Sequence, residues 1–467
     1  MSYTNGLDNP ELYFQTKIYT GTGSARSITL DGSEDMQPDW VWIKSRSNNA
    51  NPGVFDSVRG ATKLISTPSS ASESTVTVEL TSFNSDGFSL GDGSQGYTNQ
   101  NSGRTYVAWN WKAGGTAPAI TYTVKVVSDS GNKYRFDDFG TSAVTLDLQE
   151  GGTYTFDQSD SSNSGHPLRF STTSNGTHGG GSEYTTGVTT TGTPGNSGAK
   201  TVITVAASAP TLYYYCTQHS AMGGQANTNS TFGSSNFSGS IQSTVSSGIT
   251  QGMSIVSYTG NGTTNATVGH GLGVTPNVIW FKRRDSSNNW INYFSELGTG
   301  HYLTLNTNGA KDSASGAWCT PGSSTFQLNQ VFSAMNTNTA TYIAYCFAEK
   351  KGYSKFGSYT GNGNADGTFV YLGFKPAFVI IKQTNTTGDW MVLDNKRDSD
   401  NGVRHQIYAN TSGAESVEGS DRLDFLSNGI KHRSTGSRAN GSGGTYIYLA
   451  FAESPFTNSN GVPTNAR

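Results

Sequence analysis

The chain has 467 residues, enough for three or four domains, because single domains run roughly 100–200 residues. Charged residues make up 13% and hydrophobic residues 33% of the chain, both below the values of about 25% and 45–50% in ordinary globular proteins. The net charge of −3 excludes a strongly basic nucleic-acid or lipid surface, and no stretch approaches the roughly twenty apolar residues of a membrane span.

The composition favours short strands joined by turns over long helices, because glycine (58 residues), serine, threonine and asparagine are abundant while aromatic residues stay at 11%. The three cysteines, Cys216, Cys319 and Cys346, are too few for a disulfide framework. Residues 1–8 lack the basic and apolar regions of a signal peptide. We therefore expect synthesis and folding in a cytoplasm.

One module is repeated three times along the chain. A Tyr-Thr-Gly-x-Gly sequence begins at Tyr19, Tyr258 and Tyr359. Each copy continues with a proline that opens an apolar strand ending in lysine, and closes with a Thr-Tyr-containing strand; these strands are 38–44 and 105–109, 276–282 and 341–345, and 376–382 and 445–449. The constant order and spacing predict three homologous modules at roughly 12–115, 253–352 and 353–456.

Each copy consists of short runs rich in Val, Ile, Tyr, Phe and Trp, bounded by Gly, Asn, Ser and Asp, which predicts an antiparallel β-sandwich, jelly-roll-like in architecture. The strand Val41–Lys44 is apolar on both faces and is expected to lie between two layers. Asp56-Ser57-Val58-Arg59-Gly60 and Asp394-Asn395-Lys396-Arg397 occupy equivalent places and are expected to form internal salt bridges. Trp109 and Trp111 are expected to pack between modules.

Residues 116–225 break the repeat and predict a different β-module, with strands near 120–127, 143–148, 151–156, 200–205 and 212–216. The Ser/Asn/Gly-rich segment 226–252 is predicted to be a linker. The expected organisation is therefore an all-β, multidomain string of sandwiches, with units at 1–115, 116–225, 253–352 and 353–467, the last including a C-terminal tail.

Chemically potent side chains converge in the second unit. Cys216, His219 and Met222 have C-x2-H-x2-M spacing, and His166 lies in a Gly-His-Pro sequence fifty residues earlier. Two imidazoles, one thiolate and a weak axial thioether are the ligands of a mononuclear copper centre. In the alternative interpretation, Cys216 and Met222 pack as small hydrophobic residues. Zinc is a third option, although zinc favours a stronger fourth ligand than Met222.

Other constellations indicate little chemistry. The remaining histidines show no ligand spacing and are expected at the surface or in loops; they are His178, His270, His301, His405 and His432. The Asp-rich segment 398–402 is reminiscent of a calcium loop but lacks the closing glutamate. Neither paired acids nor a Ser-His-Asp arrangement is evident, so no catalytic residues and no enzyme activity are expected.

The second unit resembles the cupredoxin family over about 110 residues, through its C-x2-H-x2-M loop and the strand ending in Phe156 before an Asn-Ser-Gly-His-Pro segment. That resemblance implies a Greek-key module and a copper ion on His166, Cys216, His219 and Met222.

The repeated module resembles a domain of tail-fibre and other structural proteins of marine bacteriophages. The residues that carry the resemblance are Tyr-Thr-Gly-x-Gly, 37–44, 55–60, 83–90 and 105–112; copy two departs by carrying Ser295-Glu296-Leu297-Gly298 in place of the Asp-Ser-Val-Arg-Gly element.

This resemblance implies a virion protein, either a tail fibre or another tail or capsid appendage that serves host adhesion or particle assembly. It would be made in the bacterial host cytoplasm. The expected partners are other virion proteins of the tail, nozzle/adaptor or capsid, a host-surface glycan or protein receptor, and further copies of the chain, with a trimer favoured. Nucleic acid and membrane insertion are not expected. The alternative function is copper-dependent electron transfer or metal capture on a repeat scaffold, and a third is glycan degradation.

Overall fold

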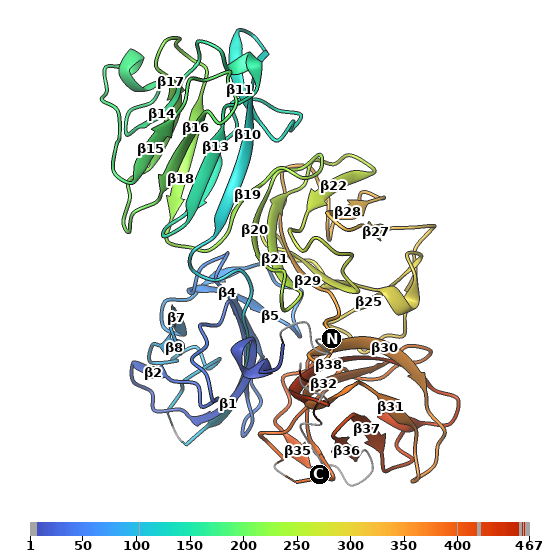
Figure 1. Ribbon diagram of the computed structural model, residues 1–467. Helices are drawn as coiled ribbons and strands as arrows, with labels where there is room; N and C mark the ends of the chain where they lie inside the picture. The colour runs from blue at the N-terminus through green and yellow to red at the C-terminus, as the bar shows by residue number, and fades with distance from the viewer. Residues whose placement is uncertain are drawn as a thin grey trace.

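Four β-modules are visible in the computed structural model, which describes residues 7–101, 103–398, 400–417, 422–456, 460 and 462 (Figure 1). The expected all-β, multi-sandwich class is confirmed. In the described part of the chain the only α-helix is α1 (Ser437–Asn440), and no helix there is long and apolar enough to cross a membrane. Short 3-10 turns complete the helical content: η1 (Pro10–Leu12), η2 (Ser161–Asn163), η3 (Gly176–Gly179) and η4 (Ser295–Leu297).

Module 1 pairs a large sheet with a small one. The large sheet has the order β1-β9-β3-β4-β5-β6, and the small sheet has the order β2-β8-β7. The strands are β1 (Phe14–Thr20), β2 (Arg26–Ile28), β3 (Trp40–Ser45), β4 (Gly53–Asp56), β5 (Lys63–Ser66), β6 (Ser74–Thr75), β7 (Leu80–Asn84), β8 (Gly87–Leu90) and β9 (Thr105–Trp111).

Modules 2 and 3 repeat this arrangement strand for strand. Module 2 contains β21 (Met253–Thr259), β22 (Ala266–Gly269), β23 (Val278–Arg283), β24 (Ile291–Phe294), β25 (His301–Thr304), β26 (Asp312–Ser313), β27 (Cys319–Pro321), β28 (Thr325–Leu328) and β29 (Thr341–Phe347). Module 3 contains β30 (Ser354–Thr360), β31 (Phe369–Tyr371), β32 (Phe374–Gln383), β33 (Met391–Asp394), β34 (His405–Tyr408), β35 (Ser416–Val417), β36 (Leu423–Leu426), β37 (Gly429–His432) and β38 (Thr445–Pro455).

Strand β3 shows why the repeated strand is apolar on both faces. Alternate side chains of a strand point to opposite faces of its sheet. Val41 and Ile43 lie in the core of module 1 itself, whereas Trp40 and Trp42 lie in a second core that modules 1, 2 and 3 build together. Both faces of the large sheet are therefore buried along β3.

The shared core replaces the linear string that the sequence suggested with a compact three-module body (Figure 1). Trp40 contacts Trp280 of module 2 at 5.9 Å between ring centroids, Trp111 contacts Phe378 of module 3 at 5.3 Å, and Phe347 contacts Phe451 at 6.1 Å. The physical reason is the apolar outer face of each large sheet, which would otherwise stand in water. Trp109 and Trp111 are at most 1% exposed, which confirms their packing between modules.

Module 4 is the odd sandwich. Its two sheets have the orders β11-β10-β13-β16-β15 and β12-β18-β17-β14, and the pairs β10–β13 and β12–β18 are parallel. The strands are β10 (Ala119–Ser128), β11 (Asn132–Phe136), β12 (Leu146–Gln149), β13 (Thr153–Asp157), β14 (Leu168–Ser171), β15 (Val188–Thr191), β16 (Lys200–Thr204), β17 (Leu212–Cys216) and β18 (Gly224–Asn229).

The expectation of a linker at 226–252 is wrong. This segment completes β18 and forms β19 (Ser234–Asn236) and β20 (Ser243–Gly248), and β20 pairs along its whole length with β21, extending the large sheet of module 2. Backbone hydrogen bonds supply this pairing, so a serine-rich composition does not reveal it. The termini at 1–6 and, apart from 460 and 462, beyond 456 lie outside the described residues.

Candidate metal centre and the interfaces between repeats

Three of the four predicted ligands meet at one end of module 4. The Cys216 Sγ lies 3.9 Å from His166 Nδ1 and 3.8 Å from His219 Nδ1. One ligand atom from each of the three residues falls within 4.8 Å of the others. The fourth residue, Met222, is 1% exposed and belongs to the same module core as Cys216.

Strand pairing explains this convergence. Cys216 ends β17 and pairs with Leu168 at the start of β14, so His166, two residues upstream, lies at the same edge. Residues 217–222 then turn back, and the left-handed conformation of Ala221 (φ 60°) helps to close the loop. Cys216 is buried, His166 half-buried and His219 exposed.

Polar contacts hold the two ligand segments together. The Tyr134 hydroxyl donates to the His166 carbonyl at 2.9 Å, and the Tyr134 amide donates to the Met222 carbonyl at 3.0 Å. Gln158 Nε2 donates a further bond to the His166 carbonyl at 2.8 Å. Because one residue, Tyr134, bonds both segments, their separation is fixed by the core of the sandwich.

A second loop clamps the ligand loop from outside. Asn175 accepts a 2.7 Å hydrogen bond from the Ala221 amide through its side-chain oxygen, and Nε2 of His178 lies 3.0 Å from the Cys216 carbonyl oxygen. The sequence predicts for His178 only a position at the surface or in a loop. Its only signal was its place in a Gly-rich turn, Gly176-Thr177-His178-Gly179, which has no ligand spacing.

The donor set fits a small thiophilic cation. Two ligand atoms on one such ion lie at most about 4.3 Å apart, given about 2.0 Å for metal–imidazole and 2.3 Å for metal–thiolate bonds. Both sulfur–nitrogen separations are below that limit. Burial, followed by the proximity of His219, lowers the pKa of His166 and favours the neutral imidazole that a metal requires. A thioether as fourth group suits copper better than zinc.

Among the remaining histidines, His432 contradicts the expected surface or loop placement, since it ends strand β37 and is fully buried. His270 is also buried but lies in the loop that follows β22, as one of the two expected placements allows. At the calcium-like segment the Asp398 carboxylate is occupied by protein donors, namely the amides of Arg404 and His405 and the His405 ring at 2.6 Å. Ser399 lies outside the described residues.

The lysine that ends each repeated strand has a role in assembly. Lys44 donates to the Ser412 carbonyl of module 3 at 2.9 Å, and Lys282 donates to the Ser70 carbonyl of module 1 at 3.2 Å. Lys382 donates to the Gly309 carbonyl of module 2 at 2.7 Å. Each lysine thus bonds a loop of a neighbouring module: module 1 bonds module 3, module 3 bonds module 2, and module 2 bonds module 1. Burial lowers the pKa of each lysine to about 8.

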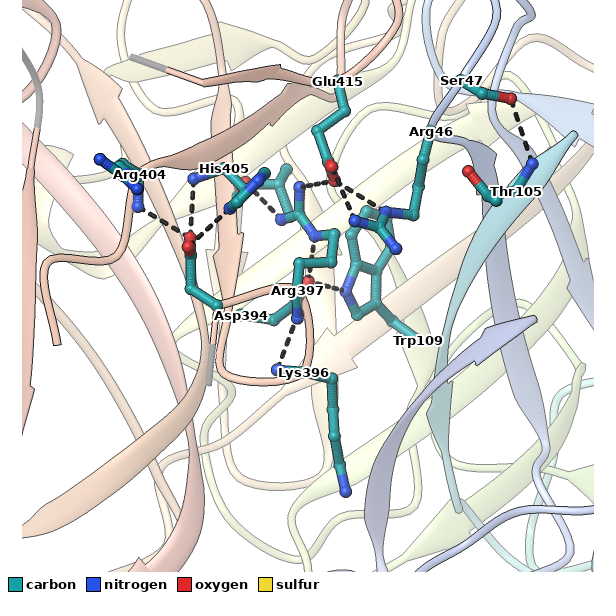
Figure 2. Close-up of polar contacts among 12 residues, drawn as sticks. Arg46, Ser47, Thr105, Trp109, Asp394, Lys396, Arg397, Arg404, His405 and Glu415 are labelled. Carbon is teal, nitrogen blue, oxygen red and sulfur yellow. Dashed lines mark hydrogen bonds and ion pairs between the residues drawn. The ribbon is translucent and has the colours of Figure 1, made fainter. Parts of the chain in front are cut away.

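The Asp-x-x-Arg elements form the expected internal salt bridges. Arg59 pairs with Asp56, and Arg397 pairs with Asp394 at 2.6 Å, with all four side chains buried. Figure 2 shows the second element, where Glu415 joins Arg397 to Arg46 of module 1. In the first element Glu73 likewise joins Arg59 to Arg284 of module 2. These networks lie at the interfaces between modules 1 and 3 and between modules 1 and 2.

At the equivalent place in the interface between modules 2 and 3, apolar residues stand where the other two interfaces have the ion network. Module 2 has Phe294 in the register position of the two aspartates. Module 3 has Leu449, which carries no polar group, in the register position of Tyr345 and Trp109. Both Phe294 and Leu449 belong to the shared core. Leu297 follows three residues after Phe294 and packs against the shared core. Module 2 thus lacks the Asp-x-x-Arg ion pair, and module 3 lacks the polar residue that would complete it.

Comparison with known proteins assigns a family. The chain belongs to the family described as "Domain of unknown function (DUF7483)", which matches residues 9–146 and 224–455 and so covers most of the chain. Residues 147–223, which contain all four candidate ligands, fall between the matched segments. No curated protein and no solved structure matches the chain.

Proposed function

We propose that this member of the DUF7483 family is a structural protein of a bacteriophage virion, in a tail fibre or another tail or capsid appendage, where it serves host-surface adhesion or particle assembly. The role involves no catalysis. The phage assignment is supported by the repeated motifs quoted above, and its partners would be other virion proteins and a host glycan or protein receptor.

The observation that carries a structural role is the shared core. The three repeats bury seven tryptophans in this core, each at most 1% exposed: Trp40, Trp42, Trp109, Trp111, Trp280, Trp290 and Trp390. Buried ion networks reinforce two of the three interfaces. Such a body resists deformation because close-packed protein interiors have low compressibility. A homotrimer of the chain would join three of these bodies.

The test is a density map of an intact virion from a phage that encodes this chain, together with labelling by an antibody to residues 7–115. Density for a three-module body on the tail or capsid is the expected result. A virion without the chain, isolated from infected cells that contain it, would overturn the proposal.

A specific observation favours a second function, the binding of one copper ion by module 4. The convergence of Cys216 Sγ with two Nδ1 atoms within 4 Å supports it. A bound copper would supply one-electron redox chemistry; the chain's own residues would hold the thiolate and both neutral imidazoles in place through Tyr134 and Asn175.

Copper(II) added to the purified chain should produce a strong visible absorption from thiolate-to-copper charge transfer. Cys216→Ser should abolish the absorption, whereas Cys319→Ser, a buried cysteine of module 2, should leave it unchanged. Absence of colour and of copper in the dialysed protein would contradict the proposal and leave the virion role unaffected.

A further inference from the structure

Module 2 has a hollow that the proposed function does not explain. It has a volume of about 210 Å³ and is lined by Asn289, Tyr302, Thr304, Asp312 and Phe332, among others. Pockets for drug-sized ligands measure roughly 300–1,000 Å³, so this hollow suits a single small ring. Tyr302 and Thr304 belong to β25, and Asp312 belongs to β26.

Two aromatic rings form its apolar wall. The Tyr302 and Phe332 rings lie 6.5 Å apart at 58°, and both side chains are half-buried. Trp318 packs edge-on against Tyr302 at 5.8 Å, and its indole N–H donates to the His301 carbonyl at 2.8 Å. Because Trp318 is fully buried, it fixes the Tyr302 ring from behind.

The polar side of the hollow has hydrogen-bonding groups that a ligand could use. Within the described part of the chain, neither the Asp312 carboxylate nor the Tyr302 hydroxyl has a hydrogen-bond partner. Tyr302 and Asp312 are directly opposite each other on the paired strands β25 and β26. Burial, followed by the charge of Asp312, raises the pKa of Tyr302. Asn289 uses its side-chain oxygen to accept from Asn306 at 2.9 Å, which leaves its amide N–H groups for a ligand.

The sister modules lack this constellation. Tyr302 pairs in register with Asp312, whereas the equivalent pairs are Leu64 with Ser74 in module 1 and Gln406 with Ser416 in module 3. Leu64 and Gln406 are both buried. The shared fold therefore does not require an aromatic residue or a carboxylate here.

We propose that this hollow binds one neutral hexose or N-acetylhexosamine unit of a glycan, a site that deepens the proposed function in host adhesion. The C–H face of a pyranose packs on aromatic rings, while neighbouring hydroxyl groups donate to a carboxylate and accept from amide N–H groups. The charge of Asp312, whose side chain is exposed, disfavours acidic sugars, because two carboxylates held close together repel each other.

The proposal is tested by saturation-transfer NMR on the full chain with four probes: methyl α-glucoside, methyl α-galactoside, methyl α-mannoside and N-acetylglucosamine. At least one probe should show transfer, and N-acetylneuraminic acid should show none. Tyr302→Leu, which installs the residue of module 1, should weaken binding at least tenfold, and Asp312→Asn should weaken it severalfold. Tyr371→Leu, at an exposed tyrosine of module 3, is the matched control and should bind as the parent does.

No transfer to any of the four probes would overturn the site, as would unchanged binding in both Tyr302→Leu and Asp312→Asn. Thermal unfolding of each variant shows whether the fold persists. A chain that is present in virions but binds none of the sugars loses only this site. A chain that binds a sugar but is absent from virions retains the site and loses the virion role.

Discussion

The hydroxyl of Tyr345 donates a 2.7 Å hydrogen bond to the Asp56 carboxylate across the interface between modules 2 and 1. The indole of Trp109 makes the equivalent 2.9 Å bond to Asp394 across the interface between modules 1 and 3. Both aspartates also accept from their own arginines. Each buried ion pair is thus completed by a donor from the next module.

Tyr345→Phe should destabilise the body. It removes a hydrogen bond to a buried charged group, and such bonds contribute about 1.5–3 kcal/mol. We expect the free energy of unfolding, measured by denaturant titration followed by tryptophan fluorescence, to fall by about 2 kcal/mol. Tyr371→Phe, with 54% exposure, is the matched control and should change it by less than about 0.5 kcal/mol. Equal values for the two variants would show that the bond contributes nothing.

The apolar position of Phe294, between modules 2 and 3, can be used to test whether the residues at equivalent places on the two modules must both be apolar or both be polar. Phe294→Asp alone should cost more than about 3 kcal/mol, because it buries an unpaired carboxylate in the shared core. Adding Leu297→Arg and Leu449→Tyr recreates the network of the other interfaces and should recover part of that loss. Thermal unfolding of the single and triple variants measures the recovery. A triple variant as unstable as Phe294→Asp would contradict the equivalence of the three interfaces.

Sequence reasoning succeeded where local patterns determine structure. The proline-led strands and the Tyr-Thr-Gly-x-Gly turns reappear as β3, β23 and β32 and the turns after β1, β21 and β30. The apolar pattern of Val41–Lys44 correctly indicated a strand covered on both faces. It could not show that the second cover is the neighbouring repeats, because residues such as Trp40 and Trp280 meet only through the tertiary arrangement.

The candidate metal site likewise has one part that local sequence predicts and one part that it does not. The ligand spacing of Cys216 and His219 reflects a local loop, and the structure brings both together with His166. The contacts of Asn175 and His178 join segments more than thirty residues apart and follow no sequence signature. The role of the strand-end lysines was also hidden, because their acceptors are carbonyl groups, which every residue has.

Asn175→Ala should loosen the ligand loop of module 4. Asn175 has φ 61°, a conformation that asparagine tolerates better than alanine, and its side chain accepts from the Ala221 amide. We expect a loss of about 1–2 kcal/mol in stability and a several-fold rise in the dissociation constant for copper. Asn132→Ala, at an exposed residue on β11 of the same module, is the control. Unchanged copper affinity in Asn175→Ala would show that the clamp does not position the ligands.

His432 should make module 3 sensitive to acid. It is fully buried, neither ring nitrogen has a hydrogen-bond partner in the described structure, and burial together with Lys431 lowers its pKa from 6.5 to about 4. The unfolded chain therefore binds the proton more tightly than the folded chain does. The free energy of unfolding should fall as the pH drops below 6.5, by about 3 kcal/mol at pH 4.

Leucine occupies the equivalent positions, Leu90 in module 1 and Leu328 in module 2. His432→Leu should therefore raise stability at neutral pH and reduce the slope of unfolding free energy against pH between 6.5 and 4, measured by denaturant titration at a series of pH values. The reciprocal variant Leu90→His should introduce a comparable slope in module 1. An unaltered slope in His432→Leu would assign the acid sensitivity to other groups, because no second titratable side chain is replaced in that variant.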